Sequence, residues 1–380
     1  MRVHLTRRAW LTEAFSVSVA AAVSGRLASS VLAADTPQAR VRNRAGETPR
    51  PIVAVDNVCA WPNLTVLRDG AIIATIFNQP SHGTTAGDVD CWGSEDGGQT
   101  WEKRGTPAER ENEHSNRMNV AAGLANNGDL VVIASGWTGL KASGELGQPF
   151  RERILPPWVC RSADGGRTWS VDAEAFPDPW PEAARQEVTP EGICVPFGDI
   201  LAGGDGALRV AMYTGARGAG YVFRSTDDGK TWAGAVAIAG GAVLNEPALF
   251  HLGEGKWLAA TRHDGLDLYA SEDDAKSWTH RKKVTGTQQH PGHIMRLADQ
   301  RLLLTYGNRT SPGGVDVRLS DDEGHTWGDP LRVADCEGDR GYPSSVQLPD
   351  GQVLTAFYAQ RTADHDRYHM GVVHWDPAAE

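Results

Sequence analysis

The 380-residue sequence predicts an all-β fold, a six-bladed β-propeller. Two repeats predict it. The octapeptide Ser-x-Asp-x-Gly-x-Thr-Trp occurs four times in full and once in a weakened copy, and a pair of apolar segments joined by a short turn occurs six times. Self-similarity of this kind indicates a repeat architecture. The 43 Gly and 21 Pro residues agree with many short strands joined by turns.

Each octapeptide has the composition of a hairpin turn. Its Asp can accept hydrogen bonds from backbone N–H groups of the turn, and its Gly can adopt the positive φ of a tight reversal. Its Trp is expected to pack against the neighbouring unit while the indole N–H finds a partner. The weakened copy has Ala275 for the Gly and Ser277 for the Thr. The five copies lie at 94–101, 162–169, 225–232, 271–278 and 320–327.

The strand pairs between the octapeptides set the number of blades. Most of their turns carry Asp-Gly, Asn-Gly or similar hairpin sequences. Each pair supplies the first and second strands of a blade, and the octapeptide joins the third and fourth. The last unit has no octapeptide, so we expect segment 51–55 to complete it beside 370–375. The pairs lie at 63–77, 120–137, 197–213, 246–262, 293–309 and 342–358.

This alternation assigns the two ends of the strands. The glycine turns and the octapeptides share one face, while the starts of the first strands and the loops between second and third strands share the other. Ligand sites in propellers favour the end of the central channel where the longer loops lie, which we call the mouth. The longest such loop, 138–158, is expected to wall the site.

The N-terminus is expected to lie outside the fold. The sequence Thr6-Arg7-Arg8-Ala9-Trp10-Leu11 is a twin-arginine pattern, and an apolar stretch and small residues follow it. No Cys stands directly after the expected cleavage site, and no later segment is apolar for long enough to span a bilayer. We therefore expect no membrane anchor and a periplasmic or secreted protein. The expected division is a signal peptide at 1–34, a linker at 35–49 and the propeller at 50–380.

Charge and cysteine content narrow the function further. The net charge of −11 argues against nucleic acid or an anionic membrane surface as partner. The five Cys residues form no CxxC and no zinc-ligand spacing. Twin-arginine export carries proteins that have folded in a reducing cytoplasm, so mostly buried free thiols are expected. A Cys59–Cys91 bridge is the alternative.

Four side chains are expected to meet at the mouth. Glu246 opens the first strand of the fourth blade and Arg262 ends its second strand, Arg309 ends the second strand of the fifth, and Tyr342 opens the sixth. Guanidinium groups bind carboxylates in a bidentate geometry that Lys cannot reproduce. A Tyr beside a Glu can pass its proton to that base and attack an anomeric carbon. A neutral nucleophile also avoids repelling a substrate carboxylate.

The octapeptide is the Asp-box, or BNR repeat, and the chain resembles the sialidase superfamily over about residues 50–376. That family places its base Glu, two clamp arginines and a Tyr at positions matched by Glu246, Arg262, Arg309 and Tyr342. The resemblance implies that Tyr342 is the nucleophile, Glu246 its base partner, and the two arginines a carboxylate clamp. Sialidases are retaining glycosidases with a Tyr nucleophile.

The chain departs from this family at three places. Ala60-Trp61-Pro62 stands where the family has the Arg-Ile-Pro string of its first clamp arginine, and Tyr358-Ala359 stands where a supporting Glu is usual. The acid/base Asp of the family is expected within 81–85, where His82 is the titratable side chain. Asp88 follows a few residues later. His82, ahead of Asp88, is therefore the acid/base candidate, since His titrates near neutrality.

Further polar side chains are expected near the mouth, where they could contact sugar hydroxyls. His290 and His293 form an H-x-x-H pattern without an evident third ligand, so no metal is expected. Glu191 is a weaker candidate for substrate contact. The main candidates are Asn78, Arg117, Asn119, His290 and His293.

The sequence thus predicts an exported, exo-acting, retaining and cofactor-free glycoside hydrolase that releases a terminal sialic acid or a related acidic sugar from a glycan or glycoconjugate. A clamp of two arginines loses about 1.5–3 kcal/mol of charge-assisted hydrogen bonding unless another cation fills the gap, so a related ketosidic or uronic sugar is an open alternative. Two other functions stay open. One is a non-catalytic glycan-binding propeller, and the other is a lyase that uses His82 and Tyr342 on a uronic-acid glycan.

Overall fold

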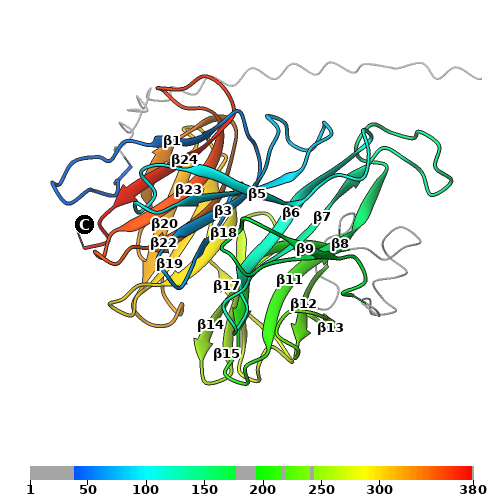
Figure 1. Cartoon of the computed structure of the whole chain (residues 1–380). Coiled ribbons are helices and arrows are strands. Elements are labelled where there is room, and N and C mark those ends of the chain that lie inside the picture. Colours follow the sequence, from blue (N-terminus) through cyan, green and yellow to red (C-terminus); the bar gives the residue numbers. More distant parts are fainter. Residues whose placement is uncertain (1–37, 177–193, 215–218, 240–243, 379–380) are drawn as a thin grey trace, which may run out of the picture. The chain divides into compact units, whose positions relative to one another are not determined.

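The computed structural model describes residues 38–176, 194–214, 219–239 and 244–378. Across these residues the chain forms 24 labelled strands and no helix (Figure 1). The predicted all-β class is confirmed. No helix that could cross a membrane occurs in the described part of the chain. The expected signal peptide and Glu191 lie outside the described residues.

The strands form six four-stranded antiparallel units. In chain order these are β2 (Asn63–Val66), β3 (Ile72–Phe77), β4 (Val89–Ser94) and β5 (Glu102–Ala108); β6 (Ser115–Leu124), β7 (Leu130–Thr138), β8 (Arg153–Ser162) and β9 (Ser170–Asp172); β10 (Cys194–Ala202), β11 (Leu208–Thr214), β12 (Gly220–Ser225) and β13 (Ala233–Ala237); β14 (Asn245–Gly253), β15 (Lys256–Arg262), β16 (Leu266–Ser271) and β17 (Thr279–Lys283); β18 (Gln289–Arg296), β19 (Leu302–Asn308), β20 (Gly314–Ser320) and β21 (Leu331–Asp335); and β22 (Glu337–Gln347), β23 (Val353–Arg361), β24 (His369–Trp375) and β1 (Ile52–Asp56). A short parallel pairing of β6 with β10 joins the second and third units into one sheet.

The last unit is completed from the beginning of the described chain. β1 pairs antiparallel with β24, with Ile52 opposite Val372, as Figure 1 shows for the blue and red strands. This confirms the pairing expected for segment 51–55. The first strands of successive units contact one another in the order β2, β6, β10, β14, β18 and β22, and β22 contacts β2 again. Each of these first strands therefore contacts the first strands of two other units.

Apolar side chains fill the layers between neighbouring units. One buried cluster joins Ile72 and Ala74 of β3 to Leu354 and Ala356 of β23. Burying one such large aliphatic side chain contributes about 1.5–3 kcal/mol. Each unit is therefore stabilised on both faces by its neighbours, which is why the inner strands read as almost continuous apolar runs.

The octapeptide turns have the geometry that their composition predicts. In the first copy, Asp96 accepts the backbone N–H of Thr100 at 2.9 Å, and the indole of Trp101 donates to the carbonyl of Gly98 at 3.1 Å. The other complete copies repeat both contacts. In the weakened copy, the indole nitrogen of Trp278 is buried and has no partner among the described residues. The turn survives there without the indole bond.

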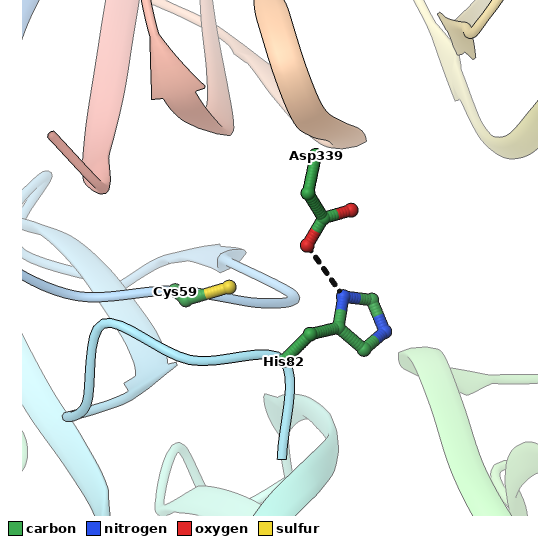
Figure 2. A group of neighbouring side chains, drawn as sticks. All are labelled: Cys59, His82 and Asp339. Atoms are coloured by element: carbon green, nitrogen blue, oxygen red, sulfur yellow. Dashed lines mark hydrogen bonds and ion pairs between the residues drawn. The ribbon is translucent and has the colours of Figure 1, made fainter. Parts of the chain in front are cut away.

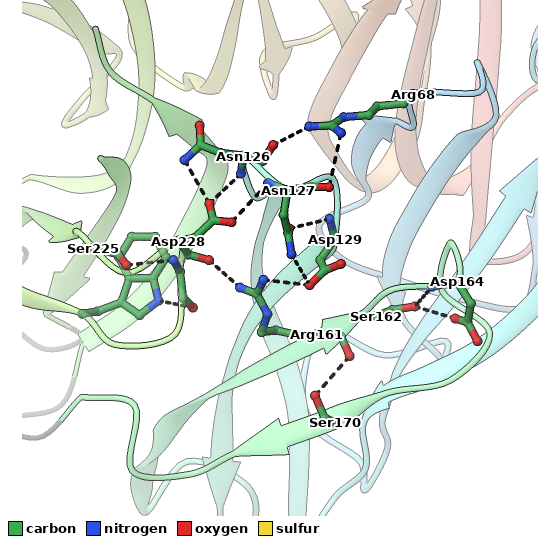
Figure 3. Close-up of polar contacts among 12 residues, drawn as sticks. Arg68, Asn126, Asn127, Asp129, Arg161, Ser162, Asp164, Ser170, Ser225 and Asp228 are labelled. Atoms are coloured by element: carbon green, nitrogen blue, oxygen red, sulfur yellow. Dashed lines mark hydrogen bonds and ion pairs between the residues drawn. The ribbon is translucent and has the colours of Figure 1, made fainter. Parts of the chain in front are cut away.

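One of these turns binds the glycine turn of the preceding unit, as Figure 3 shows. Asp228, in the octapeptide 225–232, accepts the backbone N–H groups of Asn126 at 2.6 Å and Asn127 at 3.1 Å. Its carbonyl also accepts a hydrogen bond from Arg161. The predicted sharing of one face by both kinds of turn is thus confirmed at this junction, and the opposite strand ends are left for the site.

Residues 38–49, expected to be a linker, pack against the fold. Arg40 forms a backbone bridge with Arg332, and Arg42 forms one with Asp376. Val41 is buried in a core cluster. The compact unit therefore begins at Gln38 rather than near residue 50.

Four of the five cysteines are buried free thiols, namely Cys59, Cys91, Cys160 and Cys336. The expected free thiols are confirmed for these four. The alternative of a Cys59–Cys91 bridge is wrong.

Candidate functional site

Three adjacent units open with the same local distortion. The pairing register of the first strand shifts by one residue at 245–248 in β14, at 289–292 in β18 and at 341–344 in β22. Each shift spans a residue followed by Pro, and β-bulges of this kind re-aim a side chain beside a site. The re-aimed residues are Glu246, His290 and Tyr342.

Glu246 and Tyr342 are held in the left-handed region of backbone space, with φ of 47° and 51°. Trp61, at the start of the first unit, has φ of 49°. Each precedes a Pro, a setting that favours extended backbone. A side chain in this region costs about 1–3 kcal/mol and persists where the surroundings over-determine it. The orientation of the two side chains predicted to be catalytic is therefore maintained at a cost in backbone strain.

These two side chains form one hydrogen-bonded group with an arginine. The Tyr342 hydroxyl donates to one carboxylate oxygen of Glu246. Arg262 donates to the other at 2.9 Å and to the Tyr342 oxygen at 3.4 Å. The Arg309 guanidinium lies 5.3 Å from the centre of the Tyr342 ring. The structure therefore brings together the four side chains that the sequence analysis placed at the mouth.

The electrostatics of this group keep the phenol protonated and the arginine charged. Burial and the neighbouring Glu246 raise the pKa of Tyr342. Burial alone would lower the pKa of Arg262, but Glu246 and Tyr342 more than offset that effect and raise it. Burial, Arg262 and Arg309 lower the pKa of His290 to about 3, so this imidazole is neutral near pH 7. The phenol carries its proton at rest, already aimed at a carboxylate.

His82, the first acid/base candidate, lies at the same mouth. Its ring centre is 6.2 Å from that of Tyr342 and 5.2 Å from that of Trp61. Its Nδ1 lies 2.8 Å from a carboxylate oxygen of Asp339, the contact drawn in Figure 2. An imidazole whose Nδ1 donates to a carboxylate uses Nε2 for proton exchange. His82 is therefore oriented as a general acid or base.

Asp339 is a site residue that the sequence analysis missed. Burial by itself would raise its pKa, but the hydrogen bonds from His82, Tyr358 and Tyr368 outweigh that effect and lower it. The Tyr358 hydroxyl donates to its second oxygen at 2.8 Å. The available signal was a carboxylate three residues before Tyr342, but nothing in the sequence paired it with a loop 257 positions away.

Asp88, the other acid/base candidate, is engaged elsewhere. It accepts the backbone N–H of Arg110 at 2.8 Å and the guanidinium of the same residue at 2.7 Å. Asn78 donates to it at 3.3 Å and to Asp90 at 3.4 Å. No contact of the described residues joins Asp88 to Tyr342. The geometry thus favours His82, and it places the Asn78 amide in a carboxylate network.

Arg117 does not reach the mouth, and the expectation that it contacts a sugar is wrong. Its side chain is 1% exposed. The guanidinium stacks 3.7 Å from the centre of the Trp158 ring and donates to Glu111 and to the carbonyls of Ala134 and Pro156. Burial lowers its pKa, and the Glu111 carboxylate opposes that shift. Arg117 holds the second unit together.

The two remaining histidine candidates are buried. His290 contacts Arg309 at 3.4 Å. His293 pairs with Asp199 of the third unit at 3.0 Å and accepts the backbone N–H of Ser345 at 3.3 Å. The two histidines of the H-x-x-H pattern therefore have separate partners.

Asn119 is only 4% exposed, and its side-chain oxygen has no hydrogen-bond partner among the described residues. It therefore keeps one free acceptor, but at a place that solvent hardly reaches.

Aromatic rings pack beside Tyr342, and one of them is Trp61, from the string that stands in place of the family's Arg-Ile-Pro. Trp61 packs edge-on against Tyr342 at 5.2 Å, and the Tyr358 ring lies 5.8 Å from Tyr342. Arg151, in the loop between β7 and β8, donates to the backbone carbonyl of His82 at 2.8 Å and lies 4.6 Å from the Trp137 ring. The loop expected to wall the site thus brings an arginine that the sequence analysis did not single out.

The chain can now be compared with known protein families. Residues 70–354 match the family described as BNR repeat-like domain. The chain belongs to this family. None of the curated proteins matches the chain in sequence. The BNR repeats of the family are the octapeptide turns described above.

Solved structures extend the likeness of this BNR-repeat protein to sialidases. A protein of unknown function from Dyadobacter fermentans has a TM-score of 0.71 at 22% identity, covering 87% of this chain and 99% of that one. The Hadza microbial sialidase Hz136 has a TM-score of 0.63 at 18% identity, covering 87% and 69%. The Trypanosoma rangeli sialidase in complex with sialic acid has a TM-score of 0.62 at 18% identity, covering 89% and 57%. At these identities the likeness shows the fold alone, a sialidase-like BNR-repeat fold.

Proposed function

We propose that this BNR-repeat protein is a six-bladed β-propeller and an exo-acting, retaining glycoside hydrolase for a terminal acidic sugar. The observation that carries the proposal is the hydrogen-bonded group of Tyr342, Glu246 and Arg262. The hydroxyl proton of Tyr342 is placed for transfer to the Glu246 carboxylate. The cyclic contacts of the six first strands support the propeller.

The chemistry follows from the placement of the protons. The Tyr342 oxygen attacks the anomeric carbon while its proton passes to Glu246, and Arg262 stabilises the charge that develops on the phenol oxygen. His82, held by Asp339, donates a proton from Nε2 to the departing oxygen. A water molecule then gives a proton back to His82 and attacks the anomeric carbon. The bond from that carbon to the Tyr342 oxygen breaks, and Glu246 returns its proton to the phenol, which releases the sugar and restores both residues. Two displacements retain the anomeric configuration.

The charge of the mouth supports an acidic substrate. Arg309 and Arg151 carry guanidinium groups that are not paired with a carboxylate in any contact described, whereas Arg262 is partly committed to Glu246. A planar carboxylate suits such a group. The substrate class is a glycan or glycoconjugate ending in sialic acid or in a related ketosidic or uronic sugar.

Hydrolysis of aryl glycosides of sialic acid and of uronic acids tests the proposal. We expect turnover of at least one of them and a fall in kcat of at least about a thousandfold in Tyr342→Phe, because the nucleophile is lost. Tyr269→Phe removes the hydroxyl of another buried tyrosine, in the core of the fourth unit, and is the matched control. Absence of turnover on every acidic aryl glycoside, or equal loss in both variants, would overturn the hydrolase.

A lyase is the second candidate, because His82 and Tyr342 face one mouth with their ring centres 6.2 Å apart and could serve as base and acid. A lyase releases an unsaturated uronic product that absorbs in the ultraviolet, whereas a hydrolase releases a free reducing sugar. A non-catalytic glycan-binding propeller would bind acidic glycans and yield neither product.

Export through the twin-arginine pattern is also part of the proposal. The supporting observation is the sequence Thr6-Arg7-Arg8-Ala9-Trp10-Leu11. Cell fractionation should find the protein outside the cytoplasm. Substitution of both Arg7 and Arg8 by Lys should keep it in the cytoplasm. Unchanged distribution in the variant would contradict twin-arginine export.

A further inference from the structure

Three potential metal ligands converge beside the proposed acid/base group. The Cys59 sulfur, His82 Nδ1 and an Asp339 carboxylate oxygen all lie within 4.8 Å of one another. They come from the turn after β1, the loop between β3 and β4, and β22. In Figure 2 the Cys59 sulfur is directed toward the other two side chains. Three ligand types thus meet from three separate segments.

We propose that Cys59, His82 and Asp339 bind a transition-metal dication, with Zn²⁺ as the preferred ion, and that bound metal blocks the acid/base function of His82. Atoms no more than 4.8 Å apart share a centre within about 2.8 Å of each, while zinc bonds to S, N and O are about 2.0–2.3 Å long. Each ligand atom therefore needs to move by about half an ångström or somewhat more. Such shifts are within the reach of side-chain rotation.

The ligand set selects the kind of ion. Sulfur and imidazole nitrogen favour Zn²⁺ and similar borderline ions over Ca²⁺ and Mg²⁺, which take oxygen ligands. A thiolate and a carboxylate together balance the charge of a divalent ion, and the imidazole binds as a neutral ligand. The bound thiol gives up its proton to solvent as the metal–sulfur bond forms. The assembled site therefore has no net charge to bury.

The surroundings of Asp339 supply outer hydrogen bonds of the kind that orient metal ligands. Tyr358 donates to one carboxylate oxygen at 2.8 Å, and Tyr368 donates to the other at 3.2 Å. Such partners fix the carboxylate in place and tune its affinity. Cys59 is fully buried, whereas the His82 side chain is one-third exposed. An ion would therefore enter from the His82 side, where a fourth position stays open to water.

Metal binding and the acid/base role compete for the same imidazole, although the metal binds Nδ1 and the proton cycle uses Nε2. In the structure His82 Nδ1 contacts Asp339 at 2.8 Å, and metal coordination replaces that hydrogen bond. A metal-bound imidazole keeps its Nε2 proton and cannot take part in the proton cycle. This consequence rests on the proposed function, whereas metal binding itself does not.

Metal binding to the full chain is tested after treatment with a chelator. Equilibrium dialysis with Zn²⁺ should give one tightly bound ion per chain, with at least tenfold weaker binding in Cys59→Ser. Cys91→Ser alters an equally buried thiol in an apolar cluster and should bind as the wild type does. Equal binding by all three proteins, or no tight binding by the wild type, overturns the site.

A second measurement is made on the wild type and does not depend on the folding of a variant. Co²⁺ should produce the near-ultraviolet absorption of a cobalt–thiolate bond, and its absence overturns coordination by Cys59. Zn²⁺ should also reduce glycosidase activity at least tenfold in the wild type, with a smaller reduction in Cys59→Ser. Full activity with the metal bound overturns the competition. Metal binding in a chain without any turnover would leave the site standing and remove the proposed function instead.

Discussion

Replacing Glu246 by Gln tests the proposed proton transfer most directly. The side chain keeps its shape and one acceptor oxygen but loses its charge and its ability to accept a proton. In the structure one oxygen accepts the Tyr342 hydroxyl and the other accepts Arg262 at 2.9 Å. The variant therefore leaves the phenol without a base and the arginine without its counter-charge.

Both effects have expected magnitudes. A positioned general base contributes about 10²–10⁴ to the rate, and kcat should fall by that factor. Removing one partner of a buried ion pair costs about 3–5 kcal/mol. Because the Arg262 side chain is 27% exposed and Gln still accepts a hydrogen bond, we expect a loss of about 2–3 kcal/mol in the free energy of unfolding.

Initial-rate kinetics on the best acidic aryl glycoside and denaturant unfolding measure the two effects. Glu337→Gln is the control, because Glu337 lies on the same strand as Tyr342 and forms an exposed pair with Arg361 at 3.5 Å. It should change stability by less than about 1 kcal/mol and leave kcat intact. If Glu246→Gln kept kcat within threefold of the wild type, Glu246 would not be the base of the reaction.

Three further predictions concern substrate charge and acid stability. Arg309→Met should raise KM for an acidic aryl glycoside about tenfold, because one charge-assisted contact is worth about 1.5 kcal/mol, and an unchanged KM would exclude Arg309 from the clamp. Arg151→Met should weaken inhibition by a free acidic sugar several-fold. Unaltered inhibition would show that Arg151 does not replace the first clamp arginine of the sialidase family, which this chain lacks. Hydrogen bonds from Thr100, together with others in the turn, lower the folded-state pKa of Asp96 to about 2. A lowered folded pKa contributes stability that is complete above the unfolded value near 4 and is lost as the pH falls toward 2. Thermal unfolding should therefore show stability falling between about pH 4 and pH 2, and falling less steeply in Asp96→Asn. An equal dependence on pH in the two proteins would contradict the lowered pKa of Asp96.

The repeats made most of the fold predictable. The octapeptide specifies its own turn, because Asp96, Thr100 and Trp101 bond to backbone groups within a few residues. The strand pairs follow from alternating apolar segments and turns, and counting them predicted the closing pairing of β1 with β24. The same count placed Glu246 and Tyr342 at equivalent positions in different units, so their meeting was predictable from spacing.

The failures concern contacts between side chains that no repeat relates. Arg117 occupies a suitable position in its unit, yet Trp158 and Glu111 bury it. Asp88 lies close to the expected acid position in sequence, but Arg110 binds it. Neither outcome can be read from spacing, because each depends on which neighbour fills the space around one side chain.

The sequence by itself determined the turns, the strands and the number of repeated units, because these depend on residues close together in the chain. The tertiary structure alone decided that His82 binds Asp339, that Cys59 points at both, and that Arg151 reaches the same mouth. These residues lie in segments far apart in sequence that meet only when the units pack against one another. The physical reason is that hydrogen bonds within a turn form from local geometry, whereas partners from different units are brought together by tertiary packing.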